Sequence, residues 1–303
     1  MARLILFAVL AFPWVLYASD ARKVVVVTGV SSGIAQAVVE RFARDPQYKA
    51  YGTTRKGSIT GSQDDGYILV QMDPGDTESV KNAFKKIIKA EGRVDVLVNS
   101  AGYMVLGSVE SIDPDDQLLK LFNVNVVGYA RTTQAVVPVM REIGGGRVIN
   151  VTSIQALEPR GLQESYSATR SAVETMSMGQ SSYLKDDNID VIVYEPGATR
   201  TGIMSSSPQG SIKVKGDKTL PLMSDFVEML DKRLGQGVPA DEVAEQIFAL
   251  ADQVQPDFRN FATPAVQGRA GAVYKDPTGN TLRALVRDKY EKFVNSVKDK
   301  FQN

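Results

Sequence analysis

"VVVVTGVSSGIA", residues 24–35, places a run of valines directly before a glycine-containing turn and then starts a helical pattern. Consecutive apolar β-branched residues are typical of a strand that is buried on both faces of a sheet. Gly29 and Gly33 bracket the turn, which predicts a tight reversal from strand to helix. A helix that begins there offers free N–H groups to a phosphate. The stretch therefore predicts either a dinucleotide-binding turn or an ordinary strand-to-helix turn.

The alternation of short apolar runs with amphipathic stretches continues along the chain. We expect strands at 23–29, 49–55, 67–73, 94–100, 147–153, 190–196 and 259–263, and helices at 33–45, 77–92, 117–142, 166–186 and 240–254. Strands that alternate with helices in this way are typical of a parallel sheet with crossover helices. The predicted fold class is α/β: a doubly wound Rossmann fold, with a seven-stranded, mostly parallel sheet and helices on both faces.

No repeat or low-complexity linker divides residues 22–284, so we treat them as one domain. Residues 203–235 form a long polar insertion after the sixth strand, which is typical of a lid or a disordered loop, and we expect a substrate lid. Residues 285–303 predict an amphipathic helix that packs on its own domain or contacts a partner or a membrane.

Residues 1–21 carry the pattern of a signal peptide or a short membrane anchor. Arg3 precedes an apolar run at 4–18, which ends in small residues. The run is shorter than the roughly 20 residues that a spanning helix needs, and Pro13 interrupts it. An apolar segment packed on the protein body is the third alternative. Either of the first two predicts the secretory pathway or endoplasmic reticulum, with membrane association through the N-terminus.

Composition excludes several classes of function. The 35 basic and 35 acidic side chains cancel, so we expect no nucleic-acid partner. The chain has no cysteine and no histidine, which excludes disulfides, thiol nucleophiles, the usual zinc sites and histidine-based triads. We therefore expect no metal site, and any acid or base chemistry must come from Tyr, Lys, Asp, Glu or Ser.

Four motifs in one order carry a family resemblance. They are "TGVSSGIA" at 28–35, "NSAG" at 99–102, Ser153 at the end of the fifth strand and "YSATR" at 166–170. Over about 23–200 the chain resembles the classical short-chain dehydrogenase/reductase family, which implies a single-domain oxidoreductase using NAD or NADP. Residues 239–264 and 274–280 are similar to the subgroup of 17β-hydroxysteroid and all-trans-retinol dehydrogenases.

The resemblance also implies the cofactor contacts. NAD-using members carry an acidic residue where this chain has Thr54, followed by Arg55, whose planar guanidinium suits a phosphate. NADP(H) is therefore favoured over NAD(H), unless Arg55 and Lys56 are a solvated loop pair. Asp73 matches an adenine-binding carboxylate, or alternatively starts a turn before Pro74. The implied cofactor-binding residues are Gly29, Ser31, Ser32, Gly33, Ile34, Arg55, Asp73, Asn99, Ala101, Gly102, Tyr166, Arg170, Pro196, Gly197, Thr199 and Thr201.

The implied catalytic set is Tyr166, Ser153, Asn125 and Arg170. Tyr166 would act as acid/base, Ser153 would hold the substrate oxygen, and Asn125 would kink a helix and position a water. A cation one helical turn from a phenol favours its ionised form. The family has Lys where this chain has Arg170, and a guanidinium cannot pass a proton on. Ala35 likewise replaces a usual Gly. Two alternatives remain open: an active reductase, and a weakly active or non-catalytic NADP-binding module that engages a partner.

The subgroup implies a small hydrophobic carbonyl or alcohol as substrate, such as a steroid, a retinoid or another lipid. Its steroid-converting members place a histidine in the pocket, and this chain has none. Members commonly form homodimers through the helices that match 115–140 and 166–184, so we expect a homodimer.

Overall fold

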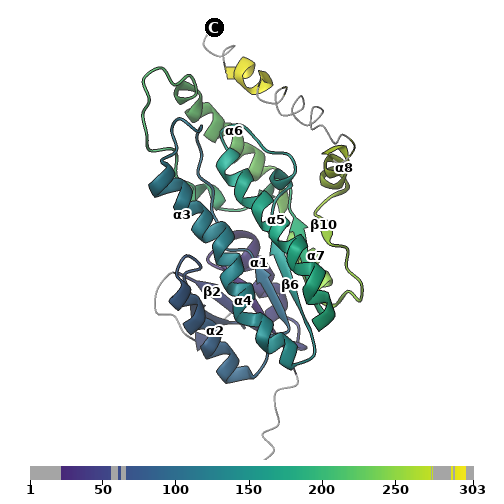
Figure 1. Cartoon of the computed structure of the whole chain (residues 1–303). Coiled ribbons are helices and arrows are strands. Elements are labelled where there is room, and N and C mark those ends of the chain that lie inside the picture. Colours follow the sequence, from purple (N-terminus) through teal and green to yellow (C-terminus); the bar gives the residue numbers. More distant parts are fainter. Residues whose placement is uncertain are drawn as a thin grey trace, which may run out of the picture.

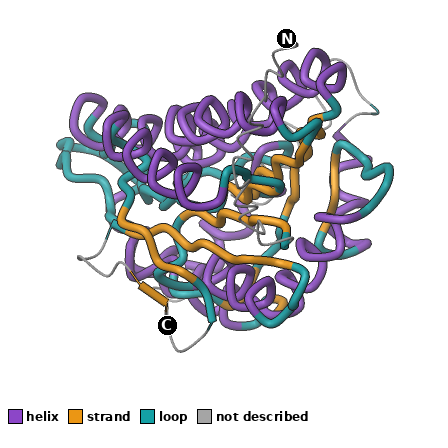
Figure 2. Tube along the Cα trace, turned by 90° about the horizontal axis from the view of Figure 1, so that it is seen from below, coloured by secondary structure: helices purple, strands orange, loops and turns teal. Residues whose placement is uncertain are grey.

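The computed structural model describes residues 22–55, 61–62, 66–273, 275, 288 and 291–297. Its main sheet has the strand order β10-β7-β6-β5-β1-β2-β4-β3 (Figures 1 and 2). The strands are β1 Lys23–Thr28, β2 Tyr48–Thr54, β3 Gly61–Ser62, β4 Ile68–Gln71, β5 Val96–Asn99, β6 Gly146–Val151, β7 Ile189–Glu195 and β10 Arg259–Phe261. Every pair is parallel except β3 with β4. The predicted seven-stranded sheet is confirmed, with β3 added at one edge.

Helices cover both faces of this sheet. They are α1 Gly33–Ala43, α2 Thr77–Glu91, α3 Leu119–Phe122, α4 Gly128–Glu142, α5 Glu164–Leu184, α6 Met223–Gly235, α7 Ala240–Asp252 and α8 Pro264–Val273. The five predicted helices are confirmed, and α6 and α8 are additional. Residues 117–142 form one helical segment in which a π-helical turn, Asn123–Val127, joins α3 to α4.

The valines of β1 show why two helical layers form. Val25 and Val27 belong to an apolar cluster with α1 and α7, whereas Val24 and Val26 belong to one with α2, α4 and the end of α5. Side chains alternate between the faces of a strand, so an uninterrupted apolar strand needs a helix on each side. The doubly wound arrangement follows from this pattern.

The chain reverses its direction across the sheet at β1. From β1 it runs outward through β2 and β4, then returns to β5 and runs the other way through β6, β7 and β10. The loops after β1 and β5 therefore diverge, and a crevice opens at the carboxyl ends of these two strands.

The 203–235 insertion lies over that crevice. A main-chain ladder holds its first half: Leu106 donates to Pro208 at 2.9 Å, Gly210 donates to Leu106 at 2.8 Å, and Ile212 donates to Ser111 at 2.9 Å. A small parallel pair of strands, β8 Thr199–Arg200 and β9 Val238–Pro239, ties its two ends together.

The predicted terminal segments fall mostly outside the described residues, including all of 1–21. Residues 291–297 are helical, the Phe293 ring lies 5.4 Å from the Phe226 ring of α6, and Val297 is buried. Within the described residues, no helix combines the length and the apolar character needed to span a membrane.

Candidate active site

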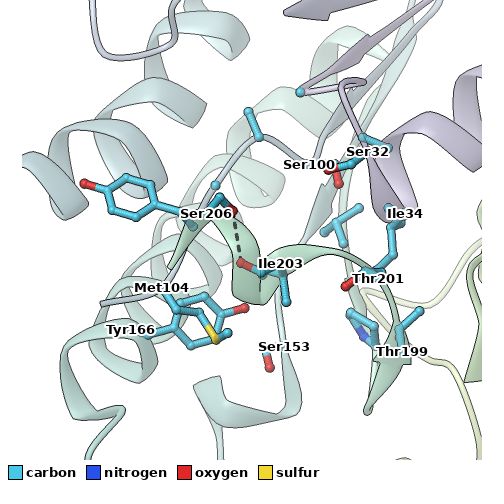
Figure 3. Close-up of a pocket in the computed structure, with 18 of the residues that line it drawn as sticks. Ser32, Ile34, Ser100, Met104, Ser153, Tyr166, Thr199, Thr201, Ile203 and Ser206 are labelled. Carbon is cyan, nitrogen blue, oxygen red and sulfur yellow. Dashed lines mark hydrogen bonds between the residues drawn. The ribbon is translucent and has the colours of Figure 1, made fainter. Parts of the chain in front are cut away.

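A cavity of about 450 Å³ occupies the crevice at the carboxyl ends of β1 and β5. Its wall runs from the glycine turn, past the loops after β5 and β6, to α5 and the insertion. Figure 3 shows Tyr166, Met104 and Ser153 on one side of this space and Ser32, Ile34, Thr199 and Thr201 on the other. The cavity thus has a glycine-turn end and an apolar end.

The glycine turn requires residues without a side chain. Gly29 and Gly33 have φ values of +83° and +68°, which other residues rarely adopt. A Cβ on Gly29 would lie 2.7 Å from the Cα of Ala101, and one on Gly33 would lie 3.1 Å from the Cβ of Thr201. The turn is therefore clamped between the loops that follow β5 and β7.

The first turn of α1 is open to a ligand. Ser32 precedes the helix in an extended conformation and its side chain makes no capping hydrogen bond, and the first turn contains no acidic residue. Ser31, Ser32, Gly33 and Ile34 line the cavity. Free N–H groups and the positive end of a helix dipole stabilise an anion at such a position.

The predicted adenosine contacts divide into two groups. Arg55 and Ser31 line the cavity, and Arg55 is exposed at the end of β2. Asp73 does not line it: its Oδ1 accepts the N–H of Gly75 at 2.8 Å, which is the turn-starting role. Its neighbours Met72 and Pro74 are in the wall.

Only part of the predicted "NSAG" segment lines the cavity. Ala101 and Gly102 line the cavity, whereas Asn99 is fully buried beneath it. The Asn99 amide donates to Asn150 at 2.9 Å and accepts from the Thr132 hydroxyl at 2.7 Å. Asn99 thus joins β5 to β6 and α4, and supports the loop without reaching the cavity.

Ser153 and Tyr166 come together at the cavity although 13 positions separate them. Their exposures are 8% and 7%, so each side chain is nearly buried but reaches the cavity surface. The Ser153 Oγ accepts the N–H of Gln155 at 3.2 Å. Its own O–H is therefore free to donate to an oxygen placed in the cavity.

Arg170 is buried beside Tyr166. Its guanidinium carbon lies 4.9 Å from the Tyr166 ring centre, and Nη1 donates to the Tyr129 hydroxyl at 3.2 Å and the Val151 carbonyl at 3.5 Å. Burial lowers the pKa of Arg170, but the phenols of Tyr166 and Tyr129 outweigh it and raise the pKa above the ordinary value. The guanidinium therefore stays charged, and it lies beside the phenol, where the spacing in "YSATR" predicts it.

Gly102 makes room for this guanidinium. A Cβ on Gly102 would lie 2.4 Å from Nη2 of Arg170 and 3.0 Å from Oδ1 of Asn125. The glycine that lines the cofactor end in the resemblance therefore also fixes where the arginine head can lie.

Asn125 lies in the π-helical turn and is fully buried. Its amide donates to the Tyr103 carbonyl at 2.9 Å and to Thr169 at 3.2 Å, and its Oδ1 accepts the Tyr103 N–H at 3.1 Å. The helix irregularity expected at Asn125 is present. Asn125 holds the loop after β5 against α5 and does not line the cavity.

The segment after β7, residues 196–201, forms another wall of the cavity. Pro196, Gly197, Thr199 and Thr201 all line the cavity. The Pro196 carbonyl accepts the N–H of Ile154 at 3.4 Å, and a Cβ on Gly197 would lie 2.9 Å from Val266 of α8. This segment therefore packs against both the Ser153 loop and α8.

An apolar cluster surrounds the Tyr166 end of the cavity. Its buried members are Met104, Leu106, Leu162, Tyr166, Met223, Phe226 and Leu230. The α6 members recur at intervals of three or four residues, a helical pattern that could have revealed this wall within the insertion.

Several polar residues at the site were missed by the sequence reasoning, among them Tyr129, Arg160 and Arg233. Tyr129 contacts Arg170 from α4, and Arg160 and Arg233 line the cavity. No motif marks them, because each is brought to the site by contacts between distant segments.

Comparisons with known proteins agree with this geometry. The family described as short chain dehydrogenase matches residues 23–211. Human 17-beta-hydroxysteroid dehydrogenase type 1 is 29% identical over 88% of this chain and 86% of its own length. The 3-ketodihydrosphingosine reductase of Bacteroides thetaiotaomicron is 26% identical over 81% and 89%.

A solved short-chain dehydrogenase from Streptomyces avermitilis superposes with a TM-score of 0.73 at 26% identity, covering 92% of this chain and 99% of that one. The glycine turn, the Ser153–Tyr166 pair and the strand order thus coincide with a family match over more than half of the sequence. The chain belongs to the short-chain dehydrogenase family of oxidoreductases.

Proposed function

We propose that the protein is an NADP(H)-dependent oxidoreductase that interconverts a hydrophobic ketone or aldehyde and its alcohol, with Tyr166 as the acid/base. The observation that carries this proposal is the position of Tyr166 and Ser153, between the glycine-turn end of one cavity and its apolar cluster. A substrate oxygen placed there meets both hydroxyl groups.

The residues present fit a dinucleotide. The positive-φ glycines leave a surface that a Cβ would fill, and the open end of α1 suits a pyrophosphate. Arg55 and Ser31 would hold the 2′-phosphate that distinguishes NADP from NAD. A bound nicotinamide supplies or accepts the hydride.

The side chains around Tyr166 account for the proton. Ser153 donates its O–H to the carbonyl oxygen and holds it beside the phenol. In reduction, Tyr166 gives its proton to the oxygen as negative charge develops there, and in oxidation it takes the proton back. The buried charge of Arg170 stabilises the phenolate that reduction leaves behind.

The substrate class rests on the apolar cluster and on the relatives. Met104, Leu230 and Leu234, which line the cavity, would contact the body of the substrate. The two relatives are named for a hydroxysteroid and a ketodihydrosphingosine, which are both lipid-like alcohols or ketones.

Turnover of NADPH with a panel of lipophilic ketones tests the proposal. We expect Tyr166→Phe to lower kcat at least about 100-fold, the usual contribution of a general acid, while Tyr183→Phe on the exposed part of α5 changes little. Unchanged turnover in Tyr166→Phe would exclude Tyr166 as the acid. If Arg170→Lys turns over but the native protein does not, the native chain is an NADP-binding module.

The cofactor preference is a separate arm of the same assay. Arg55→Asp should shift the ratio of kcat/KM for NADPH and NADH at least about tenfold toward NADH, because the carboxylate repels the 2′-phosphate. An unchanged ratio would remove Arg55 from the phosphate site.

A further inference from the structure

Two arginines face the apolar end of the cavity. Arg160 comes from the loop that leads from Ser153 to α5, and Arg233 comes from the last turn of α6. Both line the same cavity as Tyr166, although they come from segments far apart in the sequence. Neither belongs to the glycine turn or to the end of β2.

In the described part of the chain, neither guanidinium has a carboxylate partner. Nε of Arg160 is buried, and no described residue accepts a hydrogen bond from it. The charged groups that act on Arg160 are the guanidinium groups of Arg233 and Arg269. Glu158 pairs with Arg269, accepting a hydrogen bond from the Arg269 Nε at 2.7 Å. The cluster therefore carries an excess of positive charge.

This charge is costly in the free protein. Burial, together with the positive charges of Arg233 and Arg269, lowers the pKa of Arg160 to about 9. Burial and Arg269 also hold the pKa of Arg233 below its ordinary value. An anion bound between the two guanidinium groups would reverse both effects.

The surrounding residues define the rest of the ligand. Phe226, Leu230 and Leu234 form an apolar stripe along α6, and Arg233 lies on the same face because it is three residues beyond Leu230. Leu230, Arg233 and Leu234 all line the cavity. A molecule held there meets an apolar wall that includes Tyr166, and two cations that line the same cavity.

We propose that the substrate of this site carries an acidic group, a carboxylate or a phosphate, which Arg160 and Arg233 bind. Both anions match the planar donor fork of arginine. The inference rests on the proposed function for the carbonyl or alcohol group, and adds the class of substrate: an acidic, lipid-like ketone, aldehyde or alcohol.

Binding can be measured without turnover. Full-length protein saturated with NADP⁺ is titrated by calorimetry with dodecanoate, dodecyl phosphate and dodecanol, below their micelle or solubility limits. We expect at least one of the acidic ligands to bind about tenfold or more tightly than dodecanol, and the better one identifies the acidic group.

Matched variants locate the contact. Arg160→Met and Arg233→Met should each weaken the acidic ligand about tenfold and leave dodecanol unchanged. Lys232→Met removes the neighbouring charge on α6, which does not line the cavity, and should change neither. Equal affinity for acidic and neutral ligands, or an equal effect of Lys232→Met, would overturn the proposal. An equal loss of NADPH affinity would assign the arginines to the cofactor and would also overturn it.

Stability gives a second test. Removal of an unpaired, partly buried charge should leave the unfolding free energy of the ligand-free protein unchanged or raised in Arg160→Met. A decrease would show that Arg160 is paired within the protein, which would overturn the proposal. Tyr166→Phe should retain acid binding, so a failure of the proposed activity remains distinguishable from a failure of this inference.

Discussion

Tyr129 helps to hold the charged guanidinium of Arg170 in place. Its hydroxyl accepts from Arg170 and donates to the Val151 carbonyl at 3.1 Å, so one phenol joins α4, α5 and β6. Among the described residues the Arg170 Nε has no hydrogen-bond partner, so the Nη1 contacts help to hold the guanidinium in place. We therefore expect Tyr129 to position the Arg170 guanidinium beside Tyr166.

We expect Tyr129→Phe to lower kcat several-fold to tenfold, because about 1 kcal/mol of hydrogen bonding to Arg170 is lost and the guanidinium can turn away from Tyr166. KM for the carbonyl substrate should change less. Steady-state kinetics and urea unfolding, measured on the same preparation, separate this effect from instability. A loss of stability with unchanged kcat would show that Tyr129 only packs the helices.

The sequence predicted the cation beside the phenol, but not the orientation of the cation. Tyr166 and Arg170 are one turn apart on one helix, so their proximity follows from helical geometry alone. Tyr129 lies 41 positions away on another helix, and the space beside Gly102 comes from the loop after β5. Such contacts depend on the packing of whole elements, which no local pattern encodes. For the same reason, Asn99 was expected at the cofactor and Asn125 in the catalytic set, but both are fully buried and do not line the cavity.

At the scale of elements, a buried ion cluster joins β7, α5 and β10. Arg259 donates to Glu195 at 2.6 Å and also pairs with Glu174, which accepts from the Thr152 hydroxyl at 2.9 Å. Burial, and then the negative charge of Glu174, raise the pKa of Glu195 to about 7 from an ordinary value of 4.5. Burial raises the pKa of Glu174 as well.

This cluster predicts a loss of stability as the pH rises. The folded protein binds the Glu195 proton more tightly than the unfolded chain, so its contribution is complete below pH 4.5 and is lost as the pH rises through 7. One such proton gives a slope of at most about 1.4 kcal/mol per pH unit between these limits. Urea unfolding from pH 5 to 8 should show a shallower fall in Glu195→Gln than in the native protein. Glu245→Gln, at an exposed pair, serves as the control, and equal slopes in all three would contradict the prediction.

The 203–235 insertion was predicted only in part from the sequence. Residues 203–235 were expected to form a polar lid, and polar residues do fill its first half, but the second half is the amphipathic helix α6. Phe226, Leu230 and Leu234 carry a helical period that could have predicted α6 itself. Its contacts with Met104 and Leu162 could not be predicted, since they join loops that are close only after the sheet has formed.

At the scale of the whole molecule, the apolar strands predicted the parallel sheet because such strands need a helical layer on each face. The order of the strands did not follow from these patterns, because the central strands β1, β5, β6 and β7 are similarly apolar. The edge strand β3 has only two residues and no apolar run, so no pattern marked it. The sequence thus predicted the architecture and the ends of its strands, and the cavity at those ends followed.

Exposed apolar side chains remain on α3, on α5 and at the start of α4. Leu119, Val127, Met178 and Tyr183 are between 42% and 61% exposed, and they lie on or next to the helices through which we expect dimerisation. The two helical segments pack together through Val126, Tyr129 and Val173, so their outer surfaces form one continuous side of the molecule (Figure 1). A two-fold dimer would place this side against its own copy.

We expect the native protein to be a dimer at micromolar concentration, and Val127→Lys combined with Met178→Lys to convert it to a monomer. Each lysine would appear twice in a two-fold interface, so its desolvation cost would be counted twice. Sedimentation equilibrium measures the change. Val254→Lys is the control, because Val254 is 88% exposed but lies beyond α7, away from these helices. A native monomer would contradict the expected dimer, and a dimer that tolerates both lysines would place the interface elsewhere. Loss of the dimer in the Val127→Lys/Met178→Lys variant, but not in Val254→Lys, would locate the interface on the side of the sheet opposite α1 and α7.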